Sequence, residues 1–562
     1  MVKRLRSFLT KEIDGLHEAA YLIGAFAVLS QLLGFIRDRV FASAFGAGPA
    51  LDAYYASFRI PDILFVTLSS MVSVSVLVPF LVDRISKSVD DASRFASSVA
   101  RAFLIVIVIS CAVLYFVLPG IMRGIFPDIA AGPYGVDMIA MSRILLLSPL
   151  LLGASNLVGA ILQSGKRFVL YALSPVFYNL GIIVGALVLY PTMGLPGLAW
   201  GVALGALLHV GVQIPGLRAS PIRLFGQGSI VWREVASVAV TSVPRTLALA
   251  SGQLALLACL SIASSLAAGS IAVFTLSFNL QSVPMSIVGV SYSLAAFPVL
   301  AAMYAQGKRD EYLGHLATAA RHIIFWSLPV AVGFIVLRAQ IVRVILGGGE
   351  FSWNDTRLTA ACLAFFAVSV AAQSLSLLFT RALYCAGSTR LPLIANLSSA
   401  VLIVITAILG VAAVEQGGLA RAVIETLLRV EGVPGVAVIA IAAAYSFGML
   451  VNTAILWFSF ERQYAGFTSL LSTTTRDALL ASVSLGVVSY MSLYPLSTIF
   501  GTTTLLGLLS QGLVAGVLGG LAWLVTLYAL RNDEITDVMA TVRGSVWKAK
   551  PVVDQTLDEH VA

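Results

Sequence analysis

Charged residues are scarce in this chain. Only 11% of its 562 residues are Asp, Glu, Lys or Arg, whereas 59% are hydrophobic. Soluble domains contain about 25% charged residues. The composition therefore excludes an ordinary water-soluble protein and is typical of a chain that crosses a membrane many times.

Cysteine and histidine are also rare, with four and five residues. No two cysteines form a Cys-x-x-Cys pair, and all four fall in or beside apolar stretches, which argues against disulfides and a metal centre. No Walker A sequence and no catalytic Ser/His/Asp pattern stands out. We expect no cofactor, no metal site and no enzymatic activity.

The net charge of +8 does not indicate nucleic-acid binding. Lys and Arg occur singly or in pairs in short connections, which is the positive-inside pattern of inner-membrane proteins. This pattern predicts a multi-pass protein of the bacterial cytoplasmic membrane with both termini in the cytoplasm. The basic, polar residues 1–17 are interpreted as a cytoplasmic N-terminus and not as a signal peptide.

Long apolar runs fill most of the chain. Crossing the hydrocarbon core takes about 20 residues per helix. By this rule we expect an all-α polytopic membrane protein of about fourteen transmembrane helices, with no soluble domain between them. The segments centre on residues 18–36, 61–82, 100–121, 138–162, 169–190, 195–215, 235–262, 270–301, 320–345, 358–385, 391–413, 435–459, 477–495 and 504–530.

The chain contains an internal repeat. Residues 47–60, AGPALDAYYASFRI, resemble residues 268–280, AGSIAVFTLSFNL. VPFL at 78–81 matches FPVL at 297–300, again about 220 residues later. This spacing predicts two parallel lobes of six helices each, an architecture of secondary transporters that bind substrate between the lobes.

The expected organisation follows from the repeat. An N-lobe of helices 1–6 covers 18–220, and a C-lobe of helices 7–12 covers 221–465. Helices 13 and 14 occupy 466–530, and a cytoplasmic tail follows at 531–562.

Six charges interrupt the first two apolar stretches. A charge near the bilayer centre costs from about 3 to more than 10 kcal/mol, so it usually faces a cavity or a partner. Such a cluster predicts a pathway for a polar substrate. The residues are Arg37, Asp38, Arg39, Asp52, Arg59 and Asp62.

Motifs in both halves resemble the MurJ (MviN) family of lipid II flippases, within the multidrug/oligosaccharidyl-lipid/polysaccharide exporter superfamily. The resemblance runs from about residue 15 to 530. The motifs are LGFIRD at 33–38, FGAGPALDAYYASFRIPD at 45–62, VGAILQSGKRF at 158–168, PRTLALASGQ at 244–253, GVSYSLAAFPVLA at 289–301, GGGEF at 347–351 and RALYCAGSTRLP at 381–392.

The resemblance implies two six-helix lobes around a cationic cavity, with the last two helices forming a groove for a polyprenyl tail. It implies transport of lipid II, an undecaprenyl-pyrophosphate-linked glycopeptide, from the cytoplasmic to the periplasmic leaflet for peptidoglycan synthesis. Alternating access would be driven by an ion gradient or the membrane potential, so a coupling ion is a possible partner beside the lipid bilayer.

Arginine suits such a substrate, because guanidinium groups match pyrophosphate oxygens with bidentate hydrogen bonds. Arg37 and Arg59 are the best candidates, and Asp38 and Asp52 are expected to pair with them when the cavity is empty. Asp52 is also a candidate gate residue. Arg245, about ten residues into the seventh segment, and Asn279 complete the candidate substrate-binding set.

The sequence departs from the family at other cationic positions. Gln31, Phe65, Val66 and Asn279 stand where well-studied members carry basic residues. Two alternatives therefore remain open. One is a flippase for another polyprenyl-linked glycan, and the other is a non-transporting membrane scaffold for cell-wall enzymes, in which Arg37 and Asp52 would form a fixed ion pair.

Isolated polar residues in other apolar segments have simpler explanations. Gln253, Gln281 and Asn396 either line a cavity or bond across helices. A helix–helix hydrogen bond is also expected for His209. Arg143 lies near the outer end of the fourth segment, and we expect its side chain to reach toward the membrane interface.

Overall fold

The computed structural model describes residues 16–69, 72–224, 229–501, 504–532 and 534–535. Within these ranges the chain consists of α-helices, three short π-helical turns and their connections, with no β-sheet. The expected all-helical fold is confirmed.

We call residues 16–219 the first half of the molecule. Its elements are α2 (Leu16–Phe45), α3 (Pro49–Ser57), α4 (Arg59–Leu64), η1 (Phe65–Ser69), α5 (Val74–Lys87), α6 (Val89–Ile125), α7 (Pro127–Ala131), α8 (Gly135–Leu145), α9 (Leu147–Ser164), α10 (Phe168–Val184), η2 (Gly185–Leu189), α11 (Tyr190–Met193), α12 (Leu195–Gly211) and α13 (Ile214–Ala219).

Residues 232–463 are called the second half, and a C-terminal pair follows it. The second half contains α14 (Trp232–Ser264), α15 (Ser270–Pro284), η3 (Met285–Val290), α16 (Ser291–Ala305), α17 (Arg309–Val336), α18 (Arg338–Leu346), α19 (Trp353–Cys385), α20 (Arg390–Glu415), α21 (Leu419–Leu428) and α22 (Val438–Gln463). The C-terminal pair is α23 (Ser469–Phe500) and α24 (Leu505–Ala529).

Twelve spans among the described residues are long and apolar enough to cross a membrane. They coincide with twelve of the fourteen expected segments. The other two are 18–36, which lies in α2, and 61–82, which the structure divides into α4, η1 and α5. The count of fourteen therefore stays a prediction.

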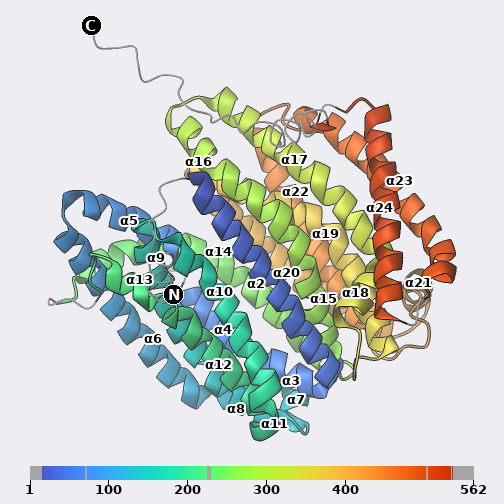
Figure 1. Ribbon diagram of the computed structural model, residues 1–562, viewed down its shortest axis with the longest axis horizontal. Helices are drawn as coiled ribbons and strands as arrows, with labels where there is room; N and C mark the ends of the chain where they lie inside the picture. The colour runs from blue at the N-terminus through green and yellow to red at the C-terminus, as the bar shows by residue number, and fades with distance from the viewer. Residues whose placement is uncertain (1–15, 70–71, 225–228, 502–503, 533, 536–562) are drawn as a thin grey trace, which may run out of the picture.

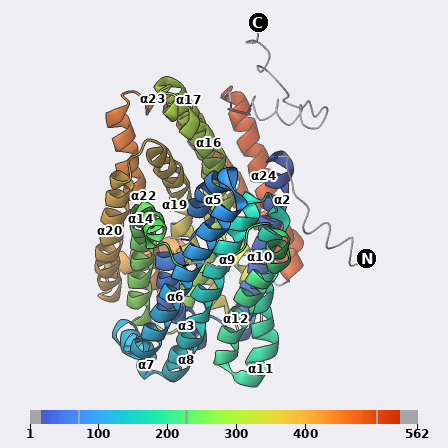
Figure 2. The ribbon, with the colours of Figure 1, turned by 90° about the vertical axis from the view of Figure 1, so that its left-hand side faces the viewer.

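The two halves lie side by side, with α2 running between them (Figure 1). Both views place α3, α7, α8 and α11 at one end of the bundle and the turn between α16 and α17 at the other (Figure 2). We call the first of these the α3 end. The C-terminal pair packs against α17 and α18 of the second half.

The internal repeat is also visible in backbone geometry. The helix segment after Asp52 continues into η1 at Phe65, and α15 continues into η3 at Met285, about 220 residues later. Pro79 and Pro298 then lie inside α5 and α16 at matching places. π-helical turns mark local irregularities that often occur at functional sites. Both halves therefore contain a π-helical turn at matching places.

Helices inside the first half approach closely where small residues face each other. A Cβ atom at Gly181 would collide with the backbone of Gly205, and one at Gly185 with Gly201. This contact joins α10 to α12. Small residues allow such close packing in membranes, where association depends on van der Waals contact.

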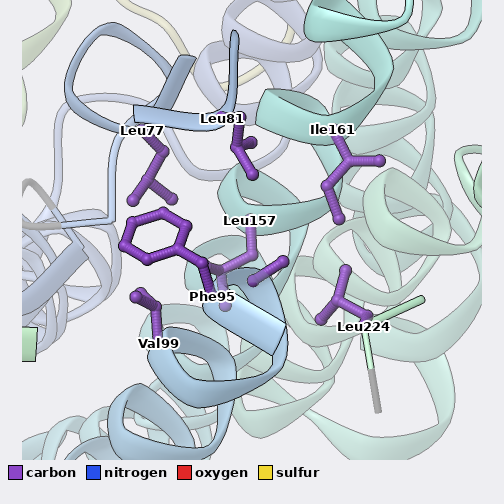
Figure 3. A pocket seen from close by; sticks show the side chains of 8 residues that line it. Leu77, Leu81, Phe95, Val99, Leu157, Ile161 and Leu224 are labelled. Carbon is purple, nitrogen blue, oxygen red and sulfur yellow. The ribbon is translucent and has the colours of Figure 1, made fainter. Parts of the chain in front are cut away.

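A cavity of about 10 Å³ lies inside the first half, between α5, α6 and α9 (Figure 3). Its lining is entirely apolar, with Phe95, Leu77 and Leu157 facing one another. A water molecule needs about 10–15 Å³ and two or more polar partners. This cavity offers no polar partner, so it is a packing defect and not a binding site.

Candidate substrate site between the two halves

The last two turns of α2 bring three consecutive charges to the boundary between the halves. Because successive residues on a helix point about 100° apart, they cannot all face one site. Arg37 and Asp38 turn toward α10 and α15, whereas Arg39 reaches α18. One charged segment of α2 therefore makes two separate contacts, one with α10 and α15 and one with α18.

Arg37 and Asp38 form the centre of the first contact. Arg37 Nε and Nη2 lie 2.9 and 2.8 Å from Asp38 Oδ1, and Arg37 Nη1 donates to Asn179 Oδ1 at 3.1 Å. Asn279 Nδ2, from the second half, donates to Asp38 Oδ2 at 3.2 Å. We call these four residues the Arg37 cluster. It joins α2, α10 and α15 across the boundary.

Asn179 holds the cluster in place from the first half. Its amide nitrogen donates to the carbonyl and hydroxyl oxygens of Ser30, at 3.2 and 3.1 Å. Its carbonyl oxygen is thereby aimed at Arg37. The Asp38 side chain is 6% exposed, but that of Arg37 is 23% exposed. The cluster thus buries its anion and leaves part of its cation accessible.

Asp52 makes the second contact across the boundary. Its Oδ2 accepts a hydrogen bond from the Gly269 backbone N–H at 2.6 Å, and its Oδ1 accepts one from Ala272 at 2.8 Å. The carboxylate therefore caps the N-terminus of α15, whose free N–H groups and helix dipole favour a negative charge. Asp52 lies in the repeat segment that corresponds to α15 itself, so each half contributes one side of this contact.

Backbone contacts complete the closure of the α3 end. Gly269 has φ +91°, and a Cβ there would collide with the Ala47 carbonyl oxygen. The Glu350 N–H donates to the Ser43 carbonyl at 2.9 Å. Segments 43–52 of the first half and 267–272 and 348–350 of the second half therefore fit without space for larger residues. We call this set of contacts, with Asp52, the latch.

Arg39 adds a contact on the other face of α2. Its Nη1 donates to the carbonyl of Val344 at 2.6 Å and lies 3.4 Å from that of Ile345. Both carbonyls belong to the C-terminal end of α18, where positive charge is favoured. Arg39 thus connects the halves, a role that the sequence did not suggest.

Among the described residues, the remaining candidates take no part in the hydrogen bonds of the Arg37 cluster. Arg59 Nη2 is 3.5 Å from Asp62, and its Nε donates to the Tyr55 carbonyl at 3.4 Å. The Arg59 side chain is 12% exposed and that of Asp62 is 40% exposed. Arg245 belongs to α14, but its side chain lies outside the described residues.

The expected pairing of carboxylates with arginines holds for only one of them. Asp38 pairs with Arg37, but Asp52 binds backbone N–H groups instead. It lies beside the start of α15, where free N–H groups are available, and no sequence pattern reveals such backbone donors. Among the described residues Arg37 and Asp52 form no ion pair, contrary to the scaffold hypothesis. Asn179 was not predicted, although a lone amide in the apolar α10 was the available signal.

Other polar side chains in apolar helices bond across helices. His209 Nδ1 lies 2.7 Å from Ser155 Oγ, which joins α12 to α9. Gln373 donates to Gln281 at 3.0 Å, joining α19 to α15. Asn452 donates to Asn396 at 2.8 Å. The expected helix–helix bond of His209 is confirmed.

An apolar groove of about 420 Å³ separates α18 from α24. Its lining includes Val344 and Ile345, whose carbonyls bind Arg39, together with Gly512 and Gly516 of α24. The groove therefore begins directly behind the contact of α2 with α18. Its volume lies within the range of about 300–1,000 Å³ that is usual for ligand pockets.

Asn279 offers a direct test of the Arg37 cluster. Asn279→Asp places a second carboxylate about 3.2 Å from Asp38, and two such charges repel strongly in a buried site. Asn279→Ala removes one hydrogen bond, worth about 1 kcal/mol. We expect thermal unfolding in detergent to give a clearly lower Tm for Asn279→Asp than for Asn279→Ala. Equal or higher stability of the aspartate variant would contradict the contact.

The comparisons with known proteins agree with this geometry. The family lipid II flippase MurJ matches residues 41–514, so Arg37 and Asp38 lie just before the matched range. The lipid II flippase MurJ of Burkholderia cenocepacia is 26% identical over 366 residues, 63% of this chain and 70% of that protein. A probable lipid II flippase MurJ of Vibrio cholerae is 25% identical over 510 residues, 85% of this chain and 95% of that protein.

Solved structures show the same fold. A structure described as lipid II flippase MurJ in an inward closed conformation superposes with a TM-score of 0.71 at 20% identity, covering 92% of this chain and all of that one. An inward-facing multidrug transporter of the MATE family gives 0.63 at 16% identity, covering 79% of this chain and 96% of that one. With a family match over most of its length and twelve apolar spans, this chain is a multi-pass protein of the bacterial inner membrane and belongs to the MurJ family of lipid II flippases.

Proposed function

We propose that this chain moves lipid II from the inner to the outer leaflet of the cytoplasmic membrane by alternating access, with the Arg37 cluster as its headgroup site. The observation that carries the proposal is a partly accessible arginine held between the halves of a membrane transporter. Residues 18–220 and 221–465 act as the two moving lobes.

The chemistry of the cluster suits a pyrophosphate. Two of the Arg37 N–H groups now point at one oxygen of Asp38, and a pyrophosphate oxygen can replace that oxygen without a change in guanidinium geometry. Asn279 keeps a hydrogen bond to the displaced carboxylate. The empty site thus pairs its charges internally and avoids the cost of an unpaired buried ion.

The orientation follows from the positive-inside rule, with both termini in the cytoplasm. The α3 end, closed by the latch, then faces the periplasm. Release of the headgroup to the outer leaflet requires this end to open, so Asp52 must separate from the N-terminus of α15. The latch therefore acts as the outer gate, and it keeps the Arg37 cluster closed to the periplasm while substrate enters from the cytoplasmic side.

The membrane potential supplies a driving force for this direction. One elementary charge that crosses 100 mV changes the free energy by about 2.3 kcal/mol. The pyrophosphate carries negative charge out of a cell interior that is electrically negative, so its movement is downhill. A coupling ion would add to this driving force by neutralising the empty site, so that the protein returns to its inward-facing state.

The groove between α18 and α24 is assigned to the polyprenyl tail. It is apolar, and it lies beside the helix that carries Arg37. A substrate with its headgroup between the halves can keep its tail in this groove, out of the polar site. The headgroup alone then crosses the membrane.

Filling the groove should stop transport without unfolding the protein. A Cβ at Gly512 would lie 3.3 Å from Gln340, so Gly512→Trp is expected to occupy the groove and reduce lipid II translocation in proteoliposomes by at least about tenfold. Gly520→Trp, two turns farther along α24 with no side chain or backbone within 4 Å, is the matched control. Equal transport by both variants would contradict the assignment of the polyprenyl tail to this groove.

A related flippase activity toward another polyprenyl-linked glycan remains the second candidate. It is favoured by Asn279, which offers an amide where well-studied family members have a cation. The deciding experiment measures which leaflet exposes lipid II in cells whose only flippase is this protein. Lipid II in the outer leaflet supports the proposal. Its retention in the inner leaflet, with another glycan lipid exported, would overturn it.

A further inference from the structure

A second apolar groove lies on the flank of the first half. It has a volume of about 720 Å³ and is bounded by α6, by the junction of α8 and α9, and by α12. It shares no lining residue with the Arg37 cluster or with the groove between α18 and α24. Its wall is almost wholly aliphatic and aromatic, and it includes Val108, Phe116, Leu147 and Trp200.

The groove opens toward the membrane. Phe116 is 78% exposed, Val108 50% and Trp200 42%. These side chains belong to spans that cross the bilayer, so the medium that covers them is lipid and not water. Most of the apolar stretch of α6 is likewise unburied by protein.

Arg143 is the single charged residue in the lining of this groove. It lies eight residues after Gly135 at the start of α8, which places it about 12 Å along the helix. Its Nε donates to the Tyr115 carbonyl at 3.1 Å, and its guanidinium carbon lies 4.6 Å from the centre of the Tyr115 ring. The head group is therefore held against α6 and does not extend toward the helix end.

The outer part of the guanidinium has no protein partner. Within the described part of the chain, Arg143 forms no ion pair, and its two terminal nitrogens make no hydrogen bond. A guanidinium at this depth is costly unless an anion or water meets it. Four N–H donors without a protein acceptor thus belong to a residue that lines an apolar, lipid-facing groove.

We propose that this groove binds an anionic phospholipid from the surrounding leaflet. The phosphate accepts hydrogen bonds from the terminal nitrogens of Arg143, and one acyl chain lies along Phe116, Leu147 and Trp200. Arginine presents these donors in a fork that fits phosphate oxygens. The bound lipid fills the gap between α6 and α12 and is a structural partner, distinct from the transported lipid.

Cys111 marks the floor of the site. Its Sγ lies 3.4 Å from the Leu146 carbonyl, at the junction of α8 and α9. That carbonyl precedes Pro149 in the chain, where the helix changes from α8 to α9. The groove therefore lies at the junction of α8 and α9, and a flexible acyl chain suits the irregular space between this junction and α6.

Trp200 provides a direct probe of occupancy. Lipids with dibrominated acyl chains quench a tryptophan that they contact. The full chain is prepared with the other tryptophans changed to Phe and reconstituted with dibrominated phosphatidylglycerol or dibrominated phosphatidylcholine. We expect Trp200 to be quenched at about fivefold lower mole fraction of the anionic lipid, since one basic residue near a membrane gives a preference of this size.

Three comparisons decide the assignment. Arg143→Gln should abolish the preference for phosphatidylglycerol, and Arg143→Lys should retain part of it. A protein that keeps only Trp353, which is 57% exposed at the start of α19 and outside the groove, should show no preference. Equal quenching of Trp200 by the two lipids, or a preference that survives Arg143→Gln, would overturn the proposal. Displacement of the brominated lipid by a small fraction of undecaprenyl phosphate would overturn the choice of a bilayer phospholipid.

Discussion

Asp52→Asn is expected to abolish the growth of a strain that depends on this protein, although the protein reaches normal levels in the membrane. The carboxylate accepts backbone hydrogen bonds from Gly269 and Ala272 with its two oxygens. An amide can accept with only one oxygen, and its NH₂ group faces the other N–H. The variant also loses the negative charge at the N-terminus of α15.

The expected size of the effect follows from these two losses. Hydrogen bonds to a charged group contribute about 1.5–3 kcal/mol each. Loss of one shifts the balance between the closed and open latch by about 10- to 100-fold. A gate shifted this far toward its open state exposes the Arg37 cluster to the periplasm while substrate enters, and one-way movement of the substrate is lost.

Thiol labelling can measure the state of the latch directly. Ser270 is 3% exposed beside Asp52, and Ser270→Cys is nearly isosteric. In a background without the native cysteines, a membrane-impermeant maleimide should label Cys at this position at least about tenfold faster in the Asp52→Asn variant. Asp128→Asn, an exposed carboxylate of α7 at the same end of the molecule, is the matched control. Unchanged labelling together with normal growth would show that Asp52 is not a gate.

Arg37→Gln is expected to produce the other large loss of function, and it should also lower stability. The variant leaves the Asp38 carboxylate buried with Asn279 as its remaining side-chain partner. Removing one partner of a buried ion pair costs about 3–5 kcal/mol. A simple loss of growth would therefore not separate substrate binding from folding.

The double variant Arg37→Gln/Asp38→Asn separates the two roles. It removes both charges, so Asn279 and Asn179 can bond to neutral amides and no unpaired ion remains. We expect the Tm of the double variant to return toward that of the wild type, while lipid II translocation in proteoliposomes stays at background. Recovery of transport in the double variant would show that Arg37 has only a structural role.

Some of this site could be predicted from the sequence. The pairing of Arg37 with Asp38 was predictable because adjacent charges in an apolar helix have few other partners. The opposite directions of Arg37 and Arg39 followed from helical geometry. Asn279 entered the candidate set because it stands where well-studied family members carry a basic residue, and the structure places its amide on Asp38.

Other contacts could not be predicted. Asp52 binds Gly269 and Ala272 through their backbone N–H groups, and every residue except proline has such a group, so no residue type marks the partner. Arg39 likewise binds the carbonyls of Val344 and Ile345. Arg143 was expected to reach toward the interface, but the ring and carbonyl of Tyr115 hold it in a groove.

The sequence by itself determined that this protein lies in a membrane as two repeated sets of helices, because the length of apolar runs, the distribution of basic residues and the repeated motifs are all fixed by the order of residues along the chain. It also determined which segment carries buried charge. Only the tertiary structure decided what those charges do. Besides the local pairs with Asp38 and Asp62, Arg37, Asp52 and Arg39 bind backbone groups and an amide about 140 to 300 residues away, and helix packing alone brings these distant partners within hydrogen-bonding distance. One short charged segment thereby supplies both a candidate headgroup site and the latch that closes it.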